Sequence, residues 1–438
     1  MKIPTLLKQI NPPPRLMMGP GPVNADPRVQ RAMSADLLGQ YDPAMTGYMN
    51  EVMALYRKVF ETENQWTFLI DGTSRSAIEA SLLSILEPRE KVLVPVFGRF
   101  GHLLVEISER IGAECVAIFK EWGEVFTPEE LEKAIQTHRP KVLAICQGDT
   151  STTMNQPLEP VGRLCREYGV ISYVDATASL VGNALPVDAW QIDVCTAGLQ
   201  KCLGGPSGSA PITLSDEVAK LIQRRWHVER GIAPAGFVPG PGKRIASNYF
   251  DLAMVMAYWS PQRLNHHTEA TSMLYCAREC ARCALEEGLE AVRHRHFQAS
   301  RAMQAGLRCL GLKLFGNLEF KMSNVTGVYI PDGLEGESVR RVMLEDFGIE
   351  IGTSFGPLQG RIWRIGAMGY NARKDAVLRT LNALSSVLRL HGVKVPPDDA
   401  ALAALEVYRA DGENQATPRE TDPEASEVAE RSVTIRST

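Results

Sequence analysis

One lysine in this chain stands where a charged side chain is unusual. Lys201 follows Val194–Leu199, a run of apolar and small residues, and precedes the glycine-rich stretch Gly204–Gly208. An amine that is partly shielded from water is more easily neutral, and a neutral amine can attack a carbonyl carbon or move a proton. The alternative is a solvated lysine in a surface turn. The residues around Lys201 must decide between the two.

A turn that could bind phosphate is the first such neighbour. Asp71-Gly-Thr-Ser-Arg75 follows the β-rich run Thr67–Ile70 and opens an expected helix at Ser76. Small hydroxylated residues at a helix N-terminus offer hydroxyls and free backbone N–H groups to an anion, typically a phosphate. The same residues also cap helices that bind nothing, and the sequence leaves both interpretations open.

A carboxylate and an aromatic ring are expected at the same edge of the sheet. Asp175 lies near the end of the apolar run Val170–Ala176, one crossover and one strand before Lys201. A buried carboxylate must be paired or solvated, so Asp175 is a helix cap, a metal ligand or the partner of a cationic ring nitrogen. Phe97 follows the run Lys91–Val96 and either packs in the core or stacks on a flat ligand.

These four features together are the parts that pyridoxal phosphate requires. The lysine holds its aldehyde as a Schiff base, the carboxylate keeps its ring nitrogen protonated, and the helix N-terminus holds its phosphate. No metal site is predicted, because the chain has no His-x-x-x-His and no two Cys-x-x-Cys pairs. The cysteines Cys276, Cys280 and Cys283 lack a fourth ligand. No Gly-x-Gly-x-x-Gly dinucleotide fingerprint follows a strand.

The elements that must position these residues alternate between strands and helices. This alternation favours an α/β fold with a parallel sheet covered by helices on both faces. Ligands of such sheets bind beyond the carboxyl ends of the strands, where the residues above are expected. The expected strands are Thr67–Ile70, Lys91–Val96, Cys115–Phe119, Lys141–Gln147, Val170–Ala176 and Val194–Leu199, and the expected helices are Ser76–Leu86, Leu103–Ile111, Pro128–Thr137, Glu159–Tyr168 and Asn265–Leu289.

The chain is expected to divide into four parts. A proline-rich arm, residues 1–24, precedes a large cofactor-binding domain, residues 25–289, and a small α+β domain, residues 290–395. Residues 396–438 form a polar tail. The tail allows one short helix over Ala401–Tyr408, and the remainder is too polar to bury a core, so we expect it to be disordered or loosely docked.

Composition bounds the class of protein. The 438 residues are 45% hydrophobic, which suffices for large cores, and the net charge of −4 offers no basic surface for nucleic acid. No apolar run is long enough to span a bilayer. The nine cysteines are scattered through apolar segments as free thiols. We therefore expect a cytoplasmic protein with neither nucleic-acid nor membrane partners.

Five short motifs, taken in order, resemble those of the class V aminotransferases of the alanine–glyoxylate aminotransferase family. They are Gly19-Pro-Gly-Pro-Val23, Asp71-Gly-Thr-Ser74, Val174-Asp-Ala-Thr177, Gly198-Leu-Gln-Lys-Cys202 and Trp363-Arg-Ile-Gly366. The resemblance covers roughly residues 15–392. It implies pyridoxal phosphate and fold type I, in which a large domain with a mostly parallel seven-stranded sheet is joined to a small α+β C-terminal domain. It also implies a homodimer with active sites at the subunit interface.

The resemblance further implies a role for each matching position. Lys201 matches the Schiff-base lysine, Asp175 the carboxylate at the ring nitrogen, and Arg364 the arginine that grips the substrate α-carboxylate through its planar fork. Gly21 falls among the substrate contacts. Relatives often have Ser-Gly-His where this chain has Thr-Ser-Arg. The other matched cofactor contacts are Thr73, Ser74, Arg75, Phe97, Ser151, Thr177, Gln200 and, reaching over from a partner subunit, Thr268.

Two amide side chains indicate one branch of this family. Asn265 stands where alanine–glyoxylate members usually have tyrosine, and together with Gln40 it resembles the ureidoglycine–glyoxylate aminotransferases of purine catabolism. A ureido group offers N–H donors and a carbonyl acceptor, and amide side chains answer both. The resemblance thus implies ping-pong transfer of an amino group from (S)-ureidoglycine to glyoxylate. The alternative is that Gln40 and Asn265 only cap a loop and a helix.

Three other functions stay open beside this one. Alanine or serine could be the amino donor to glyoxylate or pyruvate. Cysteine desulfuration, known in the same broad class, needs a nucleophilic cysteine, and the small-domain loop Gly352–Arg361 has none. A non-catalytic binding protein on this fold finds no support in a basic patch or a helix-turn-helix module.

Overall fold

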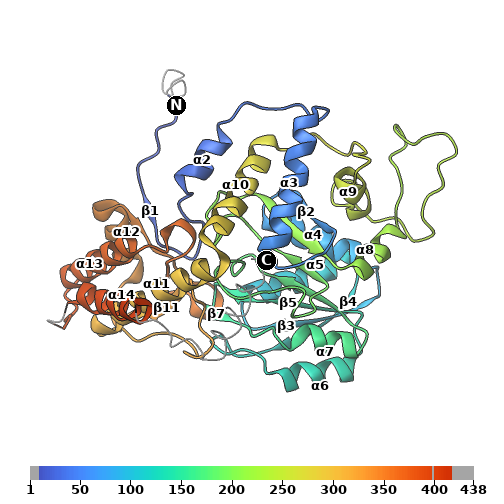
Figure 1. Cartoon of the computed structure of the whole chain (residues 1–438). Helices are drawn as coiled ribbons and strands as arrows, with labels where there is room; N and C mark the ends of the chain where they lie inside the picture. The colour runs from blue at the N-terminus through green and yellow to red at the C-terminus, as the bar shows by residue number, and fades with distance from the viewer. Residues whose placement is uncertain (1–8, 397–398, 417–438) are drawn as a thin grey trace, which may run out of the picture.

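One sheet crosses the larger part of the molecule (Figure 1). The computed structural model describes residues 9–396 and 399–416. All neighbouring strands of the sheet are parallel except the two pairs that β10 makes, so the predicted mostly parallel, seven-stranded sheet is confirmed. The strands lie in the order β2 (Trp66–Gly72), β10 (Gly208–Leu214), β9 (Val194–Thr196), β8 (Ile171–Asp175), β5 (Val142–Cys146), β3 (Lys91–Val96) and β4 (Glu114–Phe119).

β10 is the strand that the sequence did not predict. Its approach, Gly204–Gly208, is typical of a turn, and Pro211 cannot donate a hydrogen bond inside a sheet. In the structure the Pro211 carbonyl oxygen instead accepts from Ala197 N at 2.9 Å. The antiparallel pairing places the first residue of β10 opposite Gly72. The turn that carries Lys201 is therefore held between β9 and β10, close to the turn after β2.

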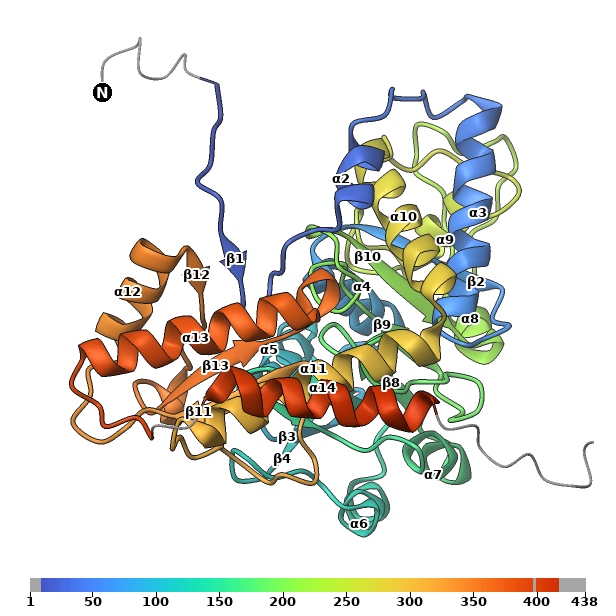
Figure 2. The same cartoon turned by 60° about the vertical axis from the view of Figure 1, so that its left-hand side comes forward.

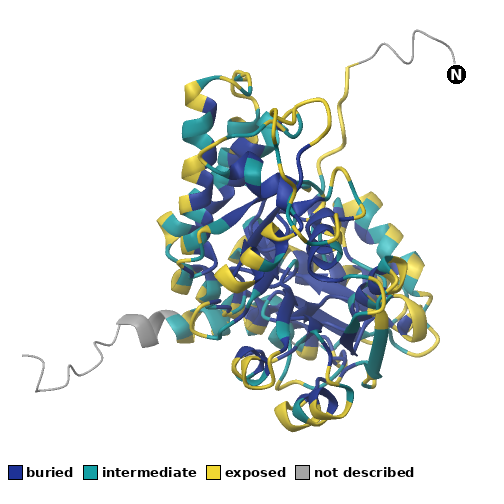
Figure 3. Cartoon of the chain, turned by 90° about the vertical axis from the view of Figure 1, so that its right-hand side faces the viewer, coloured by how far each residue is buried: buried dark blue, intermediate teal, exposed yellow. Residues whose placement is uncertain are grey.

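Helices cover both sides of the sheet. Figure 1 shows α6 and α7 on one side and α3 and α10 on the other, and in Figure 3 the strands are buried while the outer helix surfaces are exposed. The helices of this part are α2 (Pro27–Met33), α3 (Pro43–Val59), α4 (Ser74–Ile85), α5 (Arg99–Ile111), α6 (Pro128–His138), α7 (Val161–Glu167), α8 (Asp216–Gln223), α9 (Leu252–Trp259) and α10 (Thr271–Glu287). The helix predicted over Asn265–Leu289 begins only at Thr271, and Gly288, with φ +90°, separates it from α11.

A second, smaller core lies beyond α10. Its large buried side chains include Trp363 and Leu384, and it is separate from the core around the sheet. Helix α11 joins the two, because its Val292 packs in the larger core and its Ala299 in the smaller one. A domain boundary near residue 290 remains a prediction. The elements of this part are α11 (Leu289–Cys309), β11 (Val325–Tyr329), α12 (Gly336–Phe347), β12 (Ile349–Glu350), β13 (Ile362–Gly366) and α13 (Lys374–Leu390).

The N-terminal arm is laid over the smaller core. Its strand β1 (Leu16–Met17) pairs in parallel with β12, and Leu16 and Met18 are buried among the residues of that core. Beyond Met18 the arm passes Gly352 and reaches Lys201 with Gly21. A segment without a core of its own is thus held by another part of the same chain.

The C-terminal segment departs from the predicted loose tail. Residues Ala400–Ala416 form one helix, α14, which lies against α11 and α13 (Figure 2). Gly306 of α11 allows the close approach, because a Cβ there would lie 2.9 Å from the Ala400 carbonyl oxygen. Ala404 is completely buried in the smaller core. The short helix allowed over Ala401–Tyr408 is thus present but longer, because it continues to residue 416. The expected disorder of the rest of the tail stays a prediction, since that part lies outside the described residues.

Replacing Ala404 with aspartate should destabilise the protein, because the new carboxylate would be buried without a partner. We expect the free energy of unfolding to fall by about 3 kcal/mol, measured by urea denaturation. Ala410→Asp on the exposed side of the same helix is the matched control, with an expected change within about 0.5 kcal/mol. Equal effects of the two substitutions would contradict the packing of α14.

Candidate active site

A pocket of about 280 Å³ opens beyond the carboxyl ends of β2, β5 and β8. Parallel sheets bind their ligands at this edge, and the volume is at the lower end of the roughly 300–1,000 Å³ of small-molecule sites. The turns after the strands, helices α4 and α5, and the N-terminal arm supply the walls. The lining residues are Gly21, Pro22, Thr73, Ser74, Arg75, Ile78, Phe100, Leu103, Gly148, Thr150, Asp175, Thr177, Ala178, Gln200, Lys201 and Ser207.

Lys201 lines the pocket, although only 8% of its surface is exposed. Its Nζ donates a hydrogen bond of 2.5 Å to the Pro20 carbonyl oxygen. Burial and the positive charge of Arg364 lower the pKa of Lys201 to about 8, compared with about 10.4 for an ordinary lysine. The neutral amine that a nucleophile or a base requires is thus accessible near physiological pH. The solvated surface lysine considered above is excluded.

Gly21 fits against this lysine for a steric reason. Its φ of +98° favours glycine, and a Cβ there would lie 2.4 Å from the Lys201 Nζ. The arm can therefore pass directly over the amine only with glycine at this position.

Asp175 and Thr177 lie together at the end of β8, as the sequence predicts. Asp175 is 2% exposed, and its Oδ1 accepts a hydrogen bond of 2.9 Å from Thr177 N. Burial raises the pKa of Asp175, so a positive charge placed next to it would be favourable. The Thr177 Oγ1 is buried and has no hydrogen-bond partner among the described residues.

The first turn of α4 presents unused polar groups to the pocket. Thr73 stands at the N-cap position, yet its side chain makes no capping hydrogen bond, so capping does not account for its hydroxyl. Ser74 Oγ accepts a hydrogen bond of 3.2 Å from Gln200 Nε2, while Gln200 Oε1 is buried without a partner among the described residues. Arg75 lines the pocket and is exposed. Hydroxyls, amides and a cation converge here, which suits an anion.

Phe97 does not line the pocket. It is completely buried in the larger core, and Phe100 lines the pocket in its place. The cause is the start of α5, which the sequence predicts at Leu103 and which the structure places at Arg99. Because Phe100 falls in the first helical turn rather than in a loop, it reaches the edge of the sheet. Both aromatics were visible in the sequence, but the early helix start was not.

Ser151 contacts the start of α5 rather than the pocket. Its Oγ accepts from Arg99 N at 2.9 Å and donates to Asp149 Oδ1 at 2.6 Å. Asp149, which the sequence analysis did not single out, accepts from Phe100 N at 2.9 Å. The N-cap residue of α5, Gly98, has no side chain of its own to do this. Asp149 and Ser151 therefore position Phe100 and fulfil the capping role.

Arg364 lies on β13 and contacts Thr150, one of the residues that line the pocket. Its Nη1 donates to the Thr150 carbonyl oxygen at 2.9 Å, its Nε donates to the Thr353 carbonyl oxygen at 2.5 Å, and its guanidinium stacks on Phe355. Burial lowers the pKa of Arg364 to about 10, so the group stays charged at neutral pH. Its Nη2 makes no hydrogen bond with the described part of the chain, so it could bind an anion.

Gln40 and Asn265 contact each other, although they lie far apart in the sequence. Gln40 Nε2 donates a hydrogen bond of 3.1 Å to Asn265 Oδ1, and Gln40 Oε1 is buried without a partner among the described residues. Neither residue lines the pocket around Lys201. Thr268, in the same loop as Asn265, is exposed and does not line it either. The structure thus forms the predicted amide pair but places it outside the pocket of its own chain.

Comparisons with known proteins agree with this geometry. Residues 38–358 match the family model described as aminotransferase class-V. The chain is 50% identical over 413 residues to the (S)-ureidoglycine–glyoxylate transaminase of Bacillus subtilis (strain 168), covering 93% of this chain and 99% of that protein. A crystal structure of the ureidoglycine–glyoxylate aminotransferase from Bacillus subtilis superimposes with a TM-score of 0.87 at 48% identity, covering 92% of this chain and 100% of the other.

A more distant relative is named for a different amino donor. The alanine–glyoxylate aminotransferase of Drosophila melanogaster is 35% identical over 378 residues, covering 84% of this chain and 92% of that protein. Among the described residues no helix is long and apolar enough to cross a membrane. The family match covers most of the residues that line the pocket, and the similarity to the Bacillus subtilis relative extends over 93% of the chain. The chain therefore belongs to the class-V aminotransferases.

Proposed function

We propose that this chain transfers the amino group of (S)-ureidoglycine to glyoxylate, giving oxalurate and glycine, with pyridoxal phosphate as cofactor. The observation that carries the reaction class is the buried Lys201 amine, with its lowered pKa, at the carboxyl edge of the sheet. The substrate choice rests on the hydrogen-bonded pair of Gln40 and Asn265 and on the 50% identical relative of that name.

The residues of the pocket fit the cofactor. Class-V aminotransferases depend on pyridoxal phosphate. The unpartnered Thr177 Oγ1 and Gln200 Oε1, and the uncapped Thr73 hydroxyl, are polar groups that a polar ligand would satisfy. Thr73, Ser74 and Arg75 would hold the phosphate, Phe100 would cover the ring, and Asp175 would pair with the ring nitrogen. When bound, the cofactor supplies an electron-accepting ring that stabilises negative charge at the substrate Cα.

Residues of the chain would transfer the proton, bind the substrate carboxylate and position the Lys201 amine. Lys201 Nζ takes the proton from the Cα of the amino donor and returns it at the next step, since its lowered pKa keeps enough of the amine neutral. Arg364 binds the substrate carboxylate through its free Nη2. The Pro20 carbonyl oxygen holds the Lys201 amine in place.

The amide pair would act on a second copy of the chain. Gln40 and Asn265 lie outside the pocket of their own chain, and we infer that they reach the substrate of a second copy. A homodimer in which each copy supplies Gln40, Asn265 and Thr268 to the other satisfies this requirement. The unpartnered Gln40 Oε1 and the Asn265 amide would then bind the ureido group.

A panel of amino donors tests this function directly. Ureidoglycine, generated enzymatically in place because it is unstable, is compared with alanine and serine at fixed glyoxylate. We expect ureidoglycine to give the highest kcat/KM and oxalurate to accumulate with glycine. A higher value with alanine or serine would assign the chain to alanine– or serine–glyoxylate transamination instead.

Lys201→Ala should abolish transamination, because no other buried amine lines the described pocket. We expect the rate of the donor half-reaction to fall by at least about 10²–10⁴-fold and the purified protein to lose its reactivity with borohydride. Lys220→Ala, an exposed position on α8, is the control and should leave both unchanged. Residual turnover equal to that of the control would contradict the assigned role.

Gln40→Met and Asn265→Leu should discriminate between donors. Each removes hydrogen-bonding groups while keeping most of the volume, so we expect kcat/KM for ureidoglycine to fall about ten- to a hundredfold. The value for alanine, which has no ureido group, should change less than about threefold. Gln30→Met on the exposed surface of α2 controls for the substitution itself. Equal losses with both donors would reject the proposed ureido contacts.

A further inference from the structure

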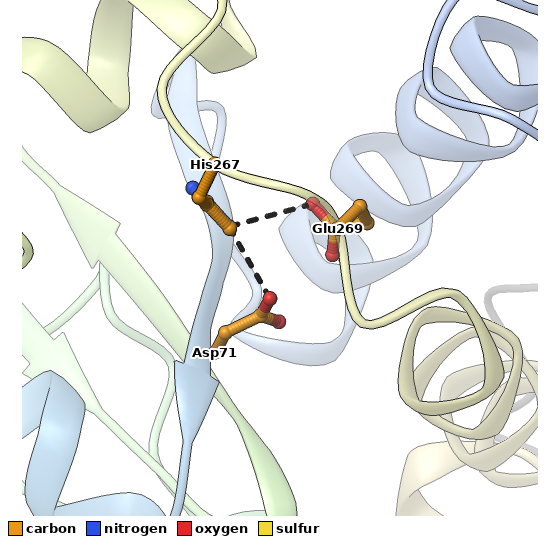
Figure 4. A group of neighbouring side chains, drawn as sticks. All are labelled: Asp71, His267 and Glu269. Carbon is orange, nitrogen blue, oxygen red and sulfur yellow. Dashed lines mark ion pairs between the residues drawn. The ribbon is translucent and has the colours of Figure 1, made fainter.

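Three ionisable side chains converge outside the pocket (Figure 4). Asp71 comes from the end of β2, and His267 and Glu269 come from the loop before α10. His267 Nε2 lies 3.2 Å from Asp71 Oδ2 and 4.0 Å from Glu269 Oε2. One ligand atom from each of the three residues lies within 4.8 Å of the other two. Nothing in the proposed transamination uses this group.

The hydrogen bonds of the neighbouring histidine define which nitrogen of His267 is bare. His266 Nε2 lies 3.1 Å from the Asn248 carbonyl oxygen, which can only accept, so His266 carries its proton on Nε2. The His266 Nδ1 is then an acceptor, and it lies 2.7 Å from His267 Nδ1. His267 must therefore donate from Nδ1, and in its neutral form its Nε2 presents a lone pair to the Asp71 and Glu269 carboxylates.

Three electron-rich atoms that face each other repel unless a proton or a metal cation lies between them. Glu269 is only 6% exposed, and its Oε2 has no hydrogen-bond partner among the described residues. The charge of Arg263 acts on Glu269, but its hydrogen bonds go to Asn50 and to backbone carbonyl oxygens of α9, and its buried Nε has no partner among the described residues.

We propose that Asp71, His267 and Glu269 form a binding site for one divalent cation of the zinc class. One imidazole and two carboxylates are a donor set that Zn²⁺ accepts, and their two negative charges match its charge. Tetrahedral zinc keeps its ligand atoms roughly 3.3 Å apart, and the His267–Asp71 separation of 3.2 Å already fits. Glu269 needs only a small movement to close the site.

The surroundings of the three ligands support the same assignment. Metal-binding histidines donate their second ring N–H to a partner that fixes the tautomer, and the His266–Asn248 pair does this for His267. Ala270 N donates to Asp71 Oδ2 at 3.0 Å, which orients that carboxylate. A bound cation would tie the loop of residues 265–270 to the end of β2, beside the turn that begins α4.

Zinc titration of the holoenzyme tests the site without reference to activity. The protein is dialysed against a chelator, desalted and titrated with ZnCl₂ by calorimetry, and metal content is then measured. We expect one Zn²⁺ per chain with a micromolar or lower Kd. Glu269→Gln keeps the size and removes the charge, and it should weaken binding by at least about tenfold. The control Glu290→Gln changes an exposed glutamate on α11, 91% exposed, and should bind as the wild type does.

Cobalt substitution distinguishes metal bound at this site from metal bound by the cysteines. Co²⁺ held by nitrogen and oxygen gives ligand-field bands without thiolate charge-transfer absorption, so the wild-type spectrum alone separates this site from the cysteines, whatever the stability of Glu269→Gln. Metal held by the cofactor would be unaffected by Glu269→Gln. No stoichiometric uptake, equal uptake by Glu269→Gln, or a thiolate band would overturn the proposal. The first of these results would leave a shared proton as the occupant of the cluster.

Discussion

The desolvation of one amine is the constraint on which the rest of the site depends. Lys201 is removed from water at the edge of a sheet, and a buried ammonium without compensation is costly. The structure compensates it with one carbonyl oxygen, that of Pro20, and places Arg364 where its charge disfavours the ammonium further. The balance lowers the pKa of Lys201 to about 8. The amine is therefore held ready for chemistry rather than for a permanent salt bridge.

The hydrogen bond from Lys201 to the Pro20 carbonyl oxygen also explains why the N-terminal arm belongs to the site. The arm pairs with β12 through β1 and buries Leu16 and Met18 in the smaller core, so its position is set by that core. Pro20 and Gly21 then extend from this anchored strand over Lys201. Arg364 lies on β13 of the same part of the molecule. A displacement of the smaller core would therefore move the Pro20 carbonyl oxygen and the Arg364 guanidinium together relative to the pocket.

The sequence predicted the residues that lie near the ends of strands. It did not predict where helix α5 begins or which distant segments pack against each other. Asp175 and Lys201 were singled out because each lies at or just after the end of an apolar run, whereas Gln200 was indicated by the family resemblance. Phe100 was missed because α5 begins four residues before the start that its apolar pattern predicts. The N-cap residue Gly98 has no side chain, and Asp149 accepts a hydrogen bond from Phe100 N instead. β10 was hidden by its proline. The close packing of α14 could not be read from its own residues, because the space that admits it, at Gly306, belongs to another helix.

If Gln40 and Asn265 select the substrate, the residues for selectivity lie on different segments from those for catalysis. Both residues lie on surface segments, in the loop before α3 and the loop before α10, which can change without disturbing the strand ends that hold Lys201 and Asp175. One amide bonds to the other, so each is held in a single orientation and keeps a carbonyl or N–H group for a ligand. The same loop carries the His267 cluster next to β2. The groups that would choose the substrate are thus positioned by contacts of their own, independent of the groups that would move the proton.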